Sequence, residues 1–153
     1  MLTAASRSVI AAGLLWLYAR LNGLTLSLEK EARIHGIVIG GLFGMEFLFI
    51  YWGLAFTTAS RSVIFLYTHP FWVALGAHFL FKDDRLNVFK VIGLVLAFTG
   101  ILFVFGSRSI HLPTGYWKGD LMELAAAFFW ASTTLYVKKM SQNRDITHYQ
   151  TLF

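Results

Sequence analysis

Five stretches of mostly apolar residues dominate the sequence, and each is close to the length of about 20 residues that a helix needs to cross a membrane. Hydrophobic residues make up 57% of the 153 positions and charged residues only 14%, against roughly 45–50% and 25% in soluble domains. This bias excludes a disordered chain, a coiled coil and a soluble enzyme with a polar surface. We predict an all-α polytopic membrane protein with about five transmembrane helices. Their ranges are Leu2–Leu21, Ile34–Phe56, Ser62–Phe81, Val88–Gly106 and Leu121–Lys139.

The connections between these stretches hold most of the charged residues, and the basic ones are divided unevenly between the two sides of the membrane. Cytoplasmic loops are enriched in Lys and Arg, so the side with more of them is predicted to be cytoplasmic, with the N-terminus outside and the C-terminus inside. The net charge of +5 is then a signal of topology, and we expect no nucleic-acid partner. The richer side carries Arg20, Lys30, Arg33, Lys82, Arg85, Lys90, Lys138, Lys139 and Arg144, and the other side carries Arg7, Arg61, Arg108 and Lys118.

The order of several short motifs resembles the EamA-type repeat of the drug/metabolite transporter superfamily. The run Tyr51–Arg61 leads into Tyr67–Leu75, which contains His69-Pro70, and an acidic turn at Asp83-Asp84-Arg85 follows. A glycine-spaced helix comes next, and Gly119-Asp120-Leu121 resembles the opening of a second repeat. The resemblance covers nearly the whole chain. It departs from the usual pattern at the acidic turn, where Gly-Glu-Arg is common, and at His69, where small polar residues are common.

The resemblance implies a fold of ten helices in two inverted repeats, of which the present stretches look like helices two to six. Residues 1–106 would then be four helices of the first repeat without its first helix, 107–119 a loop, and 120–153 the truncated start of the second repeat. A missing first helix agrees with the outside N-terminus that the charges predict. The implied partners are the lipid bilayer, a small-molecule substrate, and the missing second-repeat helices or a partner chain.

The implied function is alternating-access export of small metabolites or amino-acid-like compounds across a bacterial inner membrane. In this family the central cavity is lined mainly by the first, third, fourth and sixth helices with their symmetry mates. The resemblance therefore makes Glu46, His69, Trp72 and Trp130 candidates for the cavity lining. The alternative is a small multi-span membrane protein that scaffolds or assembles with partners and does not transport.

Glu46 lies near the middle of an apolar stretch, where a carboxylate costs roughly 2.5–3.5 kcal/mol on insertion scales. Such a residue faces the interior of a bundle or a wet cavity. We interpret it as a substrate contact or a proton-coupling site; the alternative is a protonated carboxyl group bonded to a neighbouring helix for packing.

His69 and Pro70 lie near the middle of the next stretch. Proline lacks an N–H, so the carbonyl of Leu66 loses its helical partner, and the freed carbonyl and a kink can line a cavity. His69 could pair with Glu46 if the two stretches face each other, or it is a packed neutral side chain.

The last stretch places Glu123, Trp130 and Thr134 on one face of a helix. Asp120 is predicted to cap the N-terminus of that helix. Glu123 is interpreted either as the outer mouth of a cavity or as a residue of the headgroup zone. Trp130 either stacks on an aromatic or cationic substrate or packs in the core.

Gly36, Gly40 and Gly44 recur at four-residue intervals, a ridge that lets helix backbones approach closely in lipid. Gly93 with Ala97 is a shorter example, and we predict helix packing at these glycines. The ridge also suits the scaffold alternative.

Several chemistries have no support in the sequence. Cysteine is absent, so disulfides, thiol nucleophiles and cysteine zinc sites are excluded. The sequence contains no His-Glu-x-x-His motif, no phosphate-binding Gly-x-x-x-x-Gly-Lys loop and no Gly-x-Ser-x-Gly elbow. We therefore expect neither an enzyme nor a bound metal or cofactor.

Overall fold

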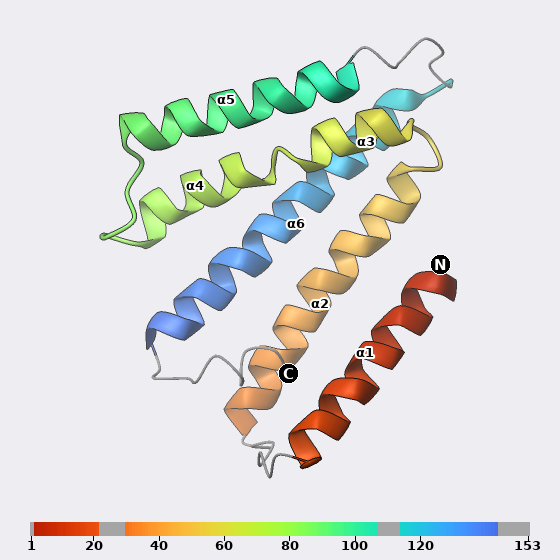
Figure 1. The fold of residues 1–153 in the computed structure, drawn as a ribbon, viewed down its shortest axis with the longest axis vertical. Coiled ribbons are helices and arrows are strands. Elements are labelled where there is room, and N and C mark those ends of the chain that lie inside the picture. Colours follow the sequence, from red (N-terminus) through yellow and green to blue (C-terminus); the bar gives the residue numbers. More distant parts are fainter. Residues whose placement is uncertain (1, 22–29, 107–113, 144–153) are drawn as a thin grey trace.

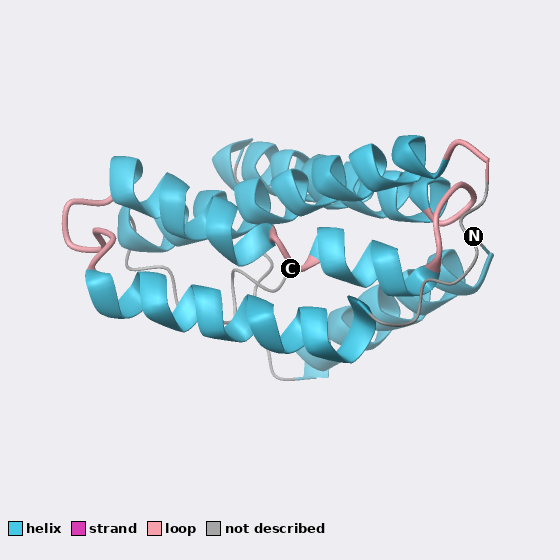
Figure 2. Cartoon of the chain, turned by 90° about the horizontal axis from the view of Figure 1, so that it is seen from above, coloured by secondary structure: helices cyan, strands magenta, loops and turns pink. Residues whose placement is uncertain are grey.

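The computed structural model describes residues 2–21, 30–106 and 114–143, and this part of the chain is built from helices joined by short connections (Figures 1 and 2). The predicted all-α class is confirmed. The helices are α1 (Leu2–Leu21), α2 (Lys30–Gly53), α3 (Ala59–Leu66), α4 (His69–Leu80), α5 (Val88–Phe105) and α6 (Tyr116–Asn143).

Three segments of the described residues are long and apolar enough to cross a membrane. They are Arg33–Gly53, Ala59–Leu80 and Val88–Phe105. Helix α1 contains a shorter apolar run, Val9–Tyr18, while α6 is long but carries several charged residues. The large side chains of α5 point outward, with Phe89 and Phe103 more than four-fifths exposed. An exposed apolar face of this kind is typical of a helix that contacts lipid.

Helix α6 is the centre of the packing, because it contacts α2, α3 and α4. Figure 1 shows it between α2 on one side and α4 on the other. Its buried face is lined by Ala126, Ala127 and Ala131. Helices do not gain a hydrophobic force by associating in lipid, so small residues that allow close approach and tight van der Waals contact are what hold such helices together.

Helices α2 and α6 run antiparallel. The hydroxyl of Tyr136 and Nδ1 of His35 lie 2.7 Å apart, which joins the start of α2 to the later part of α6. At the opposite end, a Cβ added to Gly119 would lie 2.7 Å from the carbonyl oxygen of Gly53. Phe49 stacks on Phe129 between these two contacts.

The closest helix approaches occur at glycines other than those of the predicted ridge. A Cβ added to Gly76 would lie 2.3 Å from a methyl carbon of Leu135, and Gly53 and Gly119 are equally crowded. At Gly36, Gly40, Gly44 and Gly93, nothing in the described part of the chain lies within 4 Å of such a Cβ. Packing at the predicted ridge therefore stays a prediction.

The predicted kink at Pro70 is confirmed, and it is a complete interruption. The segment divides at Tyr67 and Thr68 into the short α3 and the longer α4, with Pro70 in the first turn of α4. Proline is tolerated there because first-turn N–H groups have no helical acceptor. The Thr68 hydroxyl donates to the carbonyl of Phe65 at 2.6 Å, which satisfies one group at the break.

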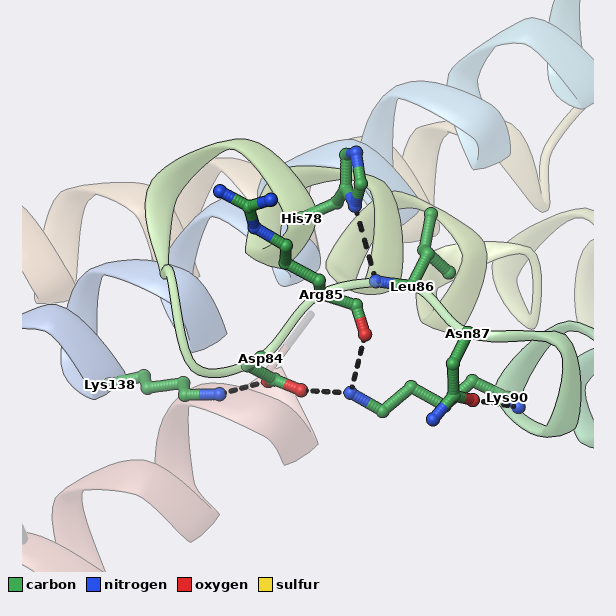
Figure 3. A network of polar contacts seen from close by, with 7 residues as sticks. All are labelled: His78, Asp84, Arg85, Leu86, Asn87, Lys90 and Lys138. Atoms are coloured by element: carbon green, nitrogen blue, oxygen red, sulfur yellow. Dashed lines mark hydrogen bonds and ion pairs between the residues drawn. The ribbon is translucent and has the colours of Figure 1, made fainter.

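Most basic residues of the described ranges lie at one end of the bundle, whereas Arg61 and Lys118 lie at the other. Asp84, in the connection between α4 and α5, forms ion pairs with Lys90 of α5 and Lys138 of α6 (Figure 3). Lys90 also donates to the carbonyl of Arg85 at 3.1 Å. Because α2 and α6 are antiparallel, Arg33 lies at this same end. The uneven charge distribution is thus built into the fold, and which side of the membrane this end faces stays a prediction.

The two ammonium groups, Lys138 first and Lys90 second, lower the pKa of Asp84 from 3.8 to about 2. Asp84 therefore stabilises the fold while it is ionised. Its contribution is fully present above about pH 4 and is lost as the pH falls through about 2.

The first prediction concerns this ion pair. Asp84→Asn should lower the free energy of unfolding by up to about 1 kcal/mol at neutral pH, because the three side chains are partly exposed. The difference from wild type should vanish toward pH 2 in unfolding experiments in detergent. Asp83→Asn, an exposed neighbour without a described ion pair, is the control and should change little. An equal loss in both variants would contradict a specific role for Asp84.

The second prediction concerns glycine packing. Gly119→Ala should destabilise the protein by about 1–3 kcal/mol, because its Cβ would meet the backbone of Gly53 and Thr57. Gly44→Ala is the matched control. It places the same methyl group in open space within a helix, and should be neutral or stabilising by up to about 1 kcal/mol. Thermal unfolding of the two variants in detergent tests the difference, and equal stabilities would disprove the proposed close approach.

Candidate functional site

A groove of about 490 Å³ lies between α4 and α5 and reaches α6. Helix α5 packs against α3, and Phe71 of α4 meets Phe98 of α5 edge-to-face at 5.4 Å. Along most of its length the wall is apolar, made by residues such as Val73 and Leu94. Polar side chains are placed at defined points: His69 and Thr134 in the wall, and Asp84 with Lys90 at the basic end.

The break between α3 and α4 positions the imidazole of His69. The ring stacks on Trp130 of α6 with centroids 4.0 Å apart and planes 3° from parallel. Its Nδ1 is buried and makes no well-formed hydrogen bond to a described residue, although the backbone of Leu66 at the helix break is close to the imidazole. His69 thus combines a fixed ring plane with a weakly bonded polar atom beside the groove. Its predicted alternative pairing with Glu46 is not among the contacts of the described residues.

Glu46 is buried, with 3% of its surface exposed. It lies on the face of α2 that packs on α6, since it is two turns from Gly53 and about three turns from His35. Its Oε2 has no partner in the described part of the chain. The structure therefore agrees with an interior carboxyl group but places it on the opposite side of α6 from the groove.

The other candidate residues are divided between different surroundings. Trp72 is 38% exposed and contacts Phe128 edge-to-face at 5.9 Å, so it is not part of the groove wall. Pro70 and Gly93 line the groove. Glu123 is fully buried where α6 meets the end of α2, away from the groove.

The predicted cap at Asp120 is wrong. Helix α6 begins at Tyr116, so Asp120 lies inside its second turn. Its carboxylate instead accepts from the hydroxyl of Thr57 at 2.8 Å and from Nε of Arg61 at 3.2 Å, and forms an ion pair with the guanidinium. Buried carboxylates need such donors, and the neighbouring elements supply them here.

Arg61 and Thr57 are polar partners that sequence reasoning did not single out. In the sequence, Arg61 stands out only as the end of the motif run Tyr51–Arg61 and as a charge of the less basic side. The pair could have been predicted, because Arg61 and Asp120 flank apolar stretches on the same side of the membrane. Opposite charges at a similar depth in the membrane are expected to pair.

The sequence model of the EamA-like transporter family matches residues 1–106. The chain belongs to the EamA-like transporter family. The family that the motif resemblance predicted is thus confirmed.

Curated relatives of this EamA-like chain are uncharacterized transporters. The transporter YoaV of Bacillus subtilis is 29% identical over 143 residues, which cover 93% of this chain and 49% of that protein. A transporter of Methanothermobacter thermautotrophicus is 27% identical over 135 residues, covering 82% of this chain and 39% of that protein. The chain spans about half the length of these relatives or less. No solved structure matches it.

The third prediction concerns the ring stack of this EamA-like chain. A double-mutant cycle of His69→Leu and Trp130→Leu should give a coupling of about 0.5–1.5 kcal/mol in the free energy of unfolding, because the rings are in direct contact. The control cycle pairs His69→Leu with Phe103→Leu, an exposed ring of α5 with no described contact to His69, and should be additive. Additivity in both cycles would show that the stack contributes nothing.

Proposed function

We propose that this chain forms part of an exporter of small amphipathic metabolites or amino-acid-like compounds that works by alternating access. The observation that carries the proposal is the groove at the broken α3–α4 segment. Interrupted helices supply backbone groups and polar side chains at mid-depth, which is how many transporters build a substrate site. Because the chain spans about half of its relatives, the complete site is proposed to include helices of the longer polypeptide.

The chemistry of the groove supports an amphipathic substrate. Its volume of about 490 Å³ lies within the range of about 300–1,000 Å³ of small-molecule sites. The apolar wall suits a hydrocarbon or aromatic group. His69 Nδ1 and the Thr134 hydroxyl are available for polar groups of the same substrate, although Thr134 also donates to the carbonyl of Trp130 at 3.0 Å.

We further propose that Glu46 couples export to protons. Glu46 and the groove lie on different sides of α6, which contacts both α2 and α4. A change in the charge of Glu46 alters the packing of α2 on α6, and α6 carries Trp130, on which the His69 ring rests. The outward direction is proposed from the motif resemblance, and the charge distribution adds that the substrate enters at the basic end if that end is cytoplasmic.

The fourth prediction tests this coupling in the complete polypeptide that carries this sequence, reconstituted in proteoliposomes. The probes are radiolabelled leucine, phenylalanine and threonine. Transport by the wild type should rise with an imposed pH gradient, and Glu46→Gln should remove that dependence because the amide binds no proton. Asp83→Asn, an exposed acid at the basic end, is the control and should keep it.

Full pH dependence in Glu46→Gln would overturn coupling through Glu46 while leaving transport intact. Failure of wild type to move any probe, with Glu46→Leu more stable than wild type, would favour the scaffold alternative. The two failures are therefore distinguishable.

A further inference from the structure

A second buried polar cluster lies at the end of the bundle opposite the basic end, where the end of α2, the start of α3 and the start of α6 meet (Figure 1). Asp120 is its centre. It accepts from Thr57 and binds Arg61 through both carboxylate oxygens. The guanidinium also lies over the ring of Tyr116 at 4.9 Å, so α3 is fastened to the first turns of α6. We call the Arg61–Asp120 pair the clasp.

Glu123 lies one turn after Asp120 on α6 and is 0% exposed. Neither of its carboxylate oxygens makes a well-formed hydrogen bond to a described residue, and the donor beside it is the side chain of Ser62 on α3. The backbone of α2 leaves it almost no room, since a Cβ on Gly53 would lie 2.8 Å from Oε1. A charged carboxylate in such a position is an uncompensated buried charge, which is far more costly than the neutral acid.

The groups that face Glu123 come from each element packed around it. Asp120 lies on its own helix, Arg61 and Ser62 come from α3, and Gly53 and Thr57 come from α2. Two more titratable groups, Tyr116 and Lys118, lie in the first turn of α6. Tyr116 lies against Arg61, and Lys118 is exposed and lies 5.7 Å from the ring of Trp117. Glu46 along α2 and His69 of α4, which lies against Trp130, are each about two turns away. Arg61 is the cation that α3 brings to this junction, and it is already paired with Asp120.

We propose that Glu123 is a proton-binding site that controls the clasp: with its proton bound the junction of α2, α3 and α6 is closed, and loss of the proton to water opens it. An ionised Glu123 lies one turn from Asp120, and like charges at that spacing repel each other. It also competes for Arg61. The charge is accommodated when α3 moves away from α6 and water or Arg61 reaches the carboxylate.

The fold allows α3 to move as a unit. It has only eight residues and is separated from α4 by the break at Tyr67 and Thr68. The clasp is the described ion pair between α3 and α6. The clasp holds this end of the bundle as the ion pairs of Asp84 hold the basic end. The proposal does not depend on proton coupling at Glu46.

The 153 residues contain no cysteine, so introduced cysteines are the labelling sites within this part of the protein and allow a direct test. Ala59→Cys on α3 and Trp117→Cys on α6 are exposed positions on the two sides of the junction. With nitroxide labels in lipid nanodiscs, pulsed electron resonance between pH 5 and pH 9 should show a longer distance that grows with pH. One released proton allows the ratio of open to closed forms to rise by up to about tenfold per pH unit.

In this background, Glu123→Gln should hold the short distance at every pH, and Glu123→Met should do the same if the amide variant does not fold. Asp120→Asn should give the long distance at every pH, because it weakens the clasp. Asp83→Asn, an exposed acid at the basic end, is the control and should keep the wild-type pH response. Glu46→Gln, the other buried acid of this helix pair, distinguishes the two proton sites, because a retained response there assigns the opening to Glu123.

Three results would overturn the proposal. They are a wild-type distance that does not change with pH, an unchanged pH response in the Glu123 variants, and loss of the response in Glu46→Gln alone. The last would assign the response to Glu46. A flat transport profile in Glu46→Gln combined with a normal distance response would support both proton sites as separate.

Discussion

The close packing of α6 against its neighbours is the constraint on which the rest of the structure depends. Alanines and glycines at these contacts let helix backbones approach until side chains of one helix touch the backbone of another. In lipid, association relies on such van der Waals contact and on interhelical polar bonds, since apolar burial gives little advantage. The small residues therefore determine which helices are neighbours.

The acidic side chains of the interior differ in the donors that reach them. Gly53 lies directly against Glu123, with no room for a Cβ atom between them. Glu46 has one oxygen without a hydrogen-bond partner among the described residues. In contrast, Asp120 lies where α3 begins, and Thr57 and Arg61 both donate to it. The donors near the start of α3 thus separate a satisfied carboxylate from the two that lack such partners.

Local properties of the sequence predicted much of the fold. The length of the apolar stretches predicted the helices, and Pro70 predicted the break between α3 and α4. The positions of the basic residues predicted that most of them lie at one end of the bundle. The burial of Glu46 followed from its depth in an apolar stretch. Family membership followed from motif order. These features depend on residues close together in the chain or on bulk partition between water and lipid.

What could not be predicted depends on tertiary contact. The stack of His69 on Trp130 joins residues of two helices whose relative rotation the sequence does not state. Asp120 was assigned to a helix cap because the apolar stretch begins after it, whereas α6 begins four residues earlier, at Tyr116. The exposed glycines of α2 form a regular pattern, yet the crowded glycines are isolated ones, because close approach depends on where helices cross.

The division of one membrane segment into α3 and α4 has a consequence for hydration. At 1.5 Å per residue, eight residues span about 12 Å and twelve span about 18 Å, together about the 30 Å of the hydrocarbon core. Helix α3 thus crosses most of one leaflet and α4 the rest. Backbone at the break, well below either headgroup layer, is stable there only beside protein or water. The break therefore depends on α6, on which the His69 ring rests, and on the groove beside it, because lipid offers no partner to its backbone groups.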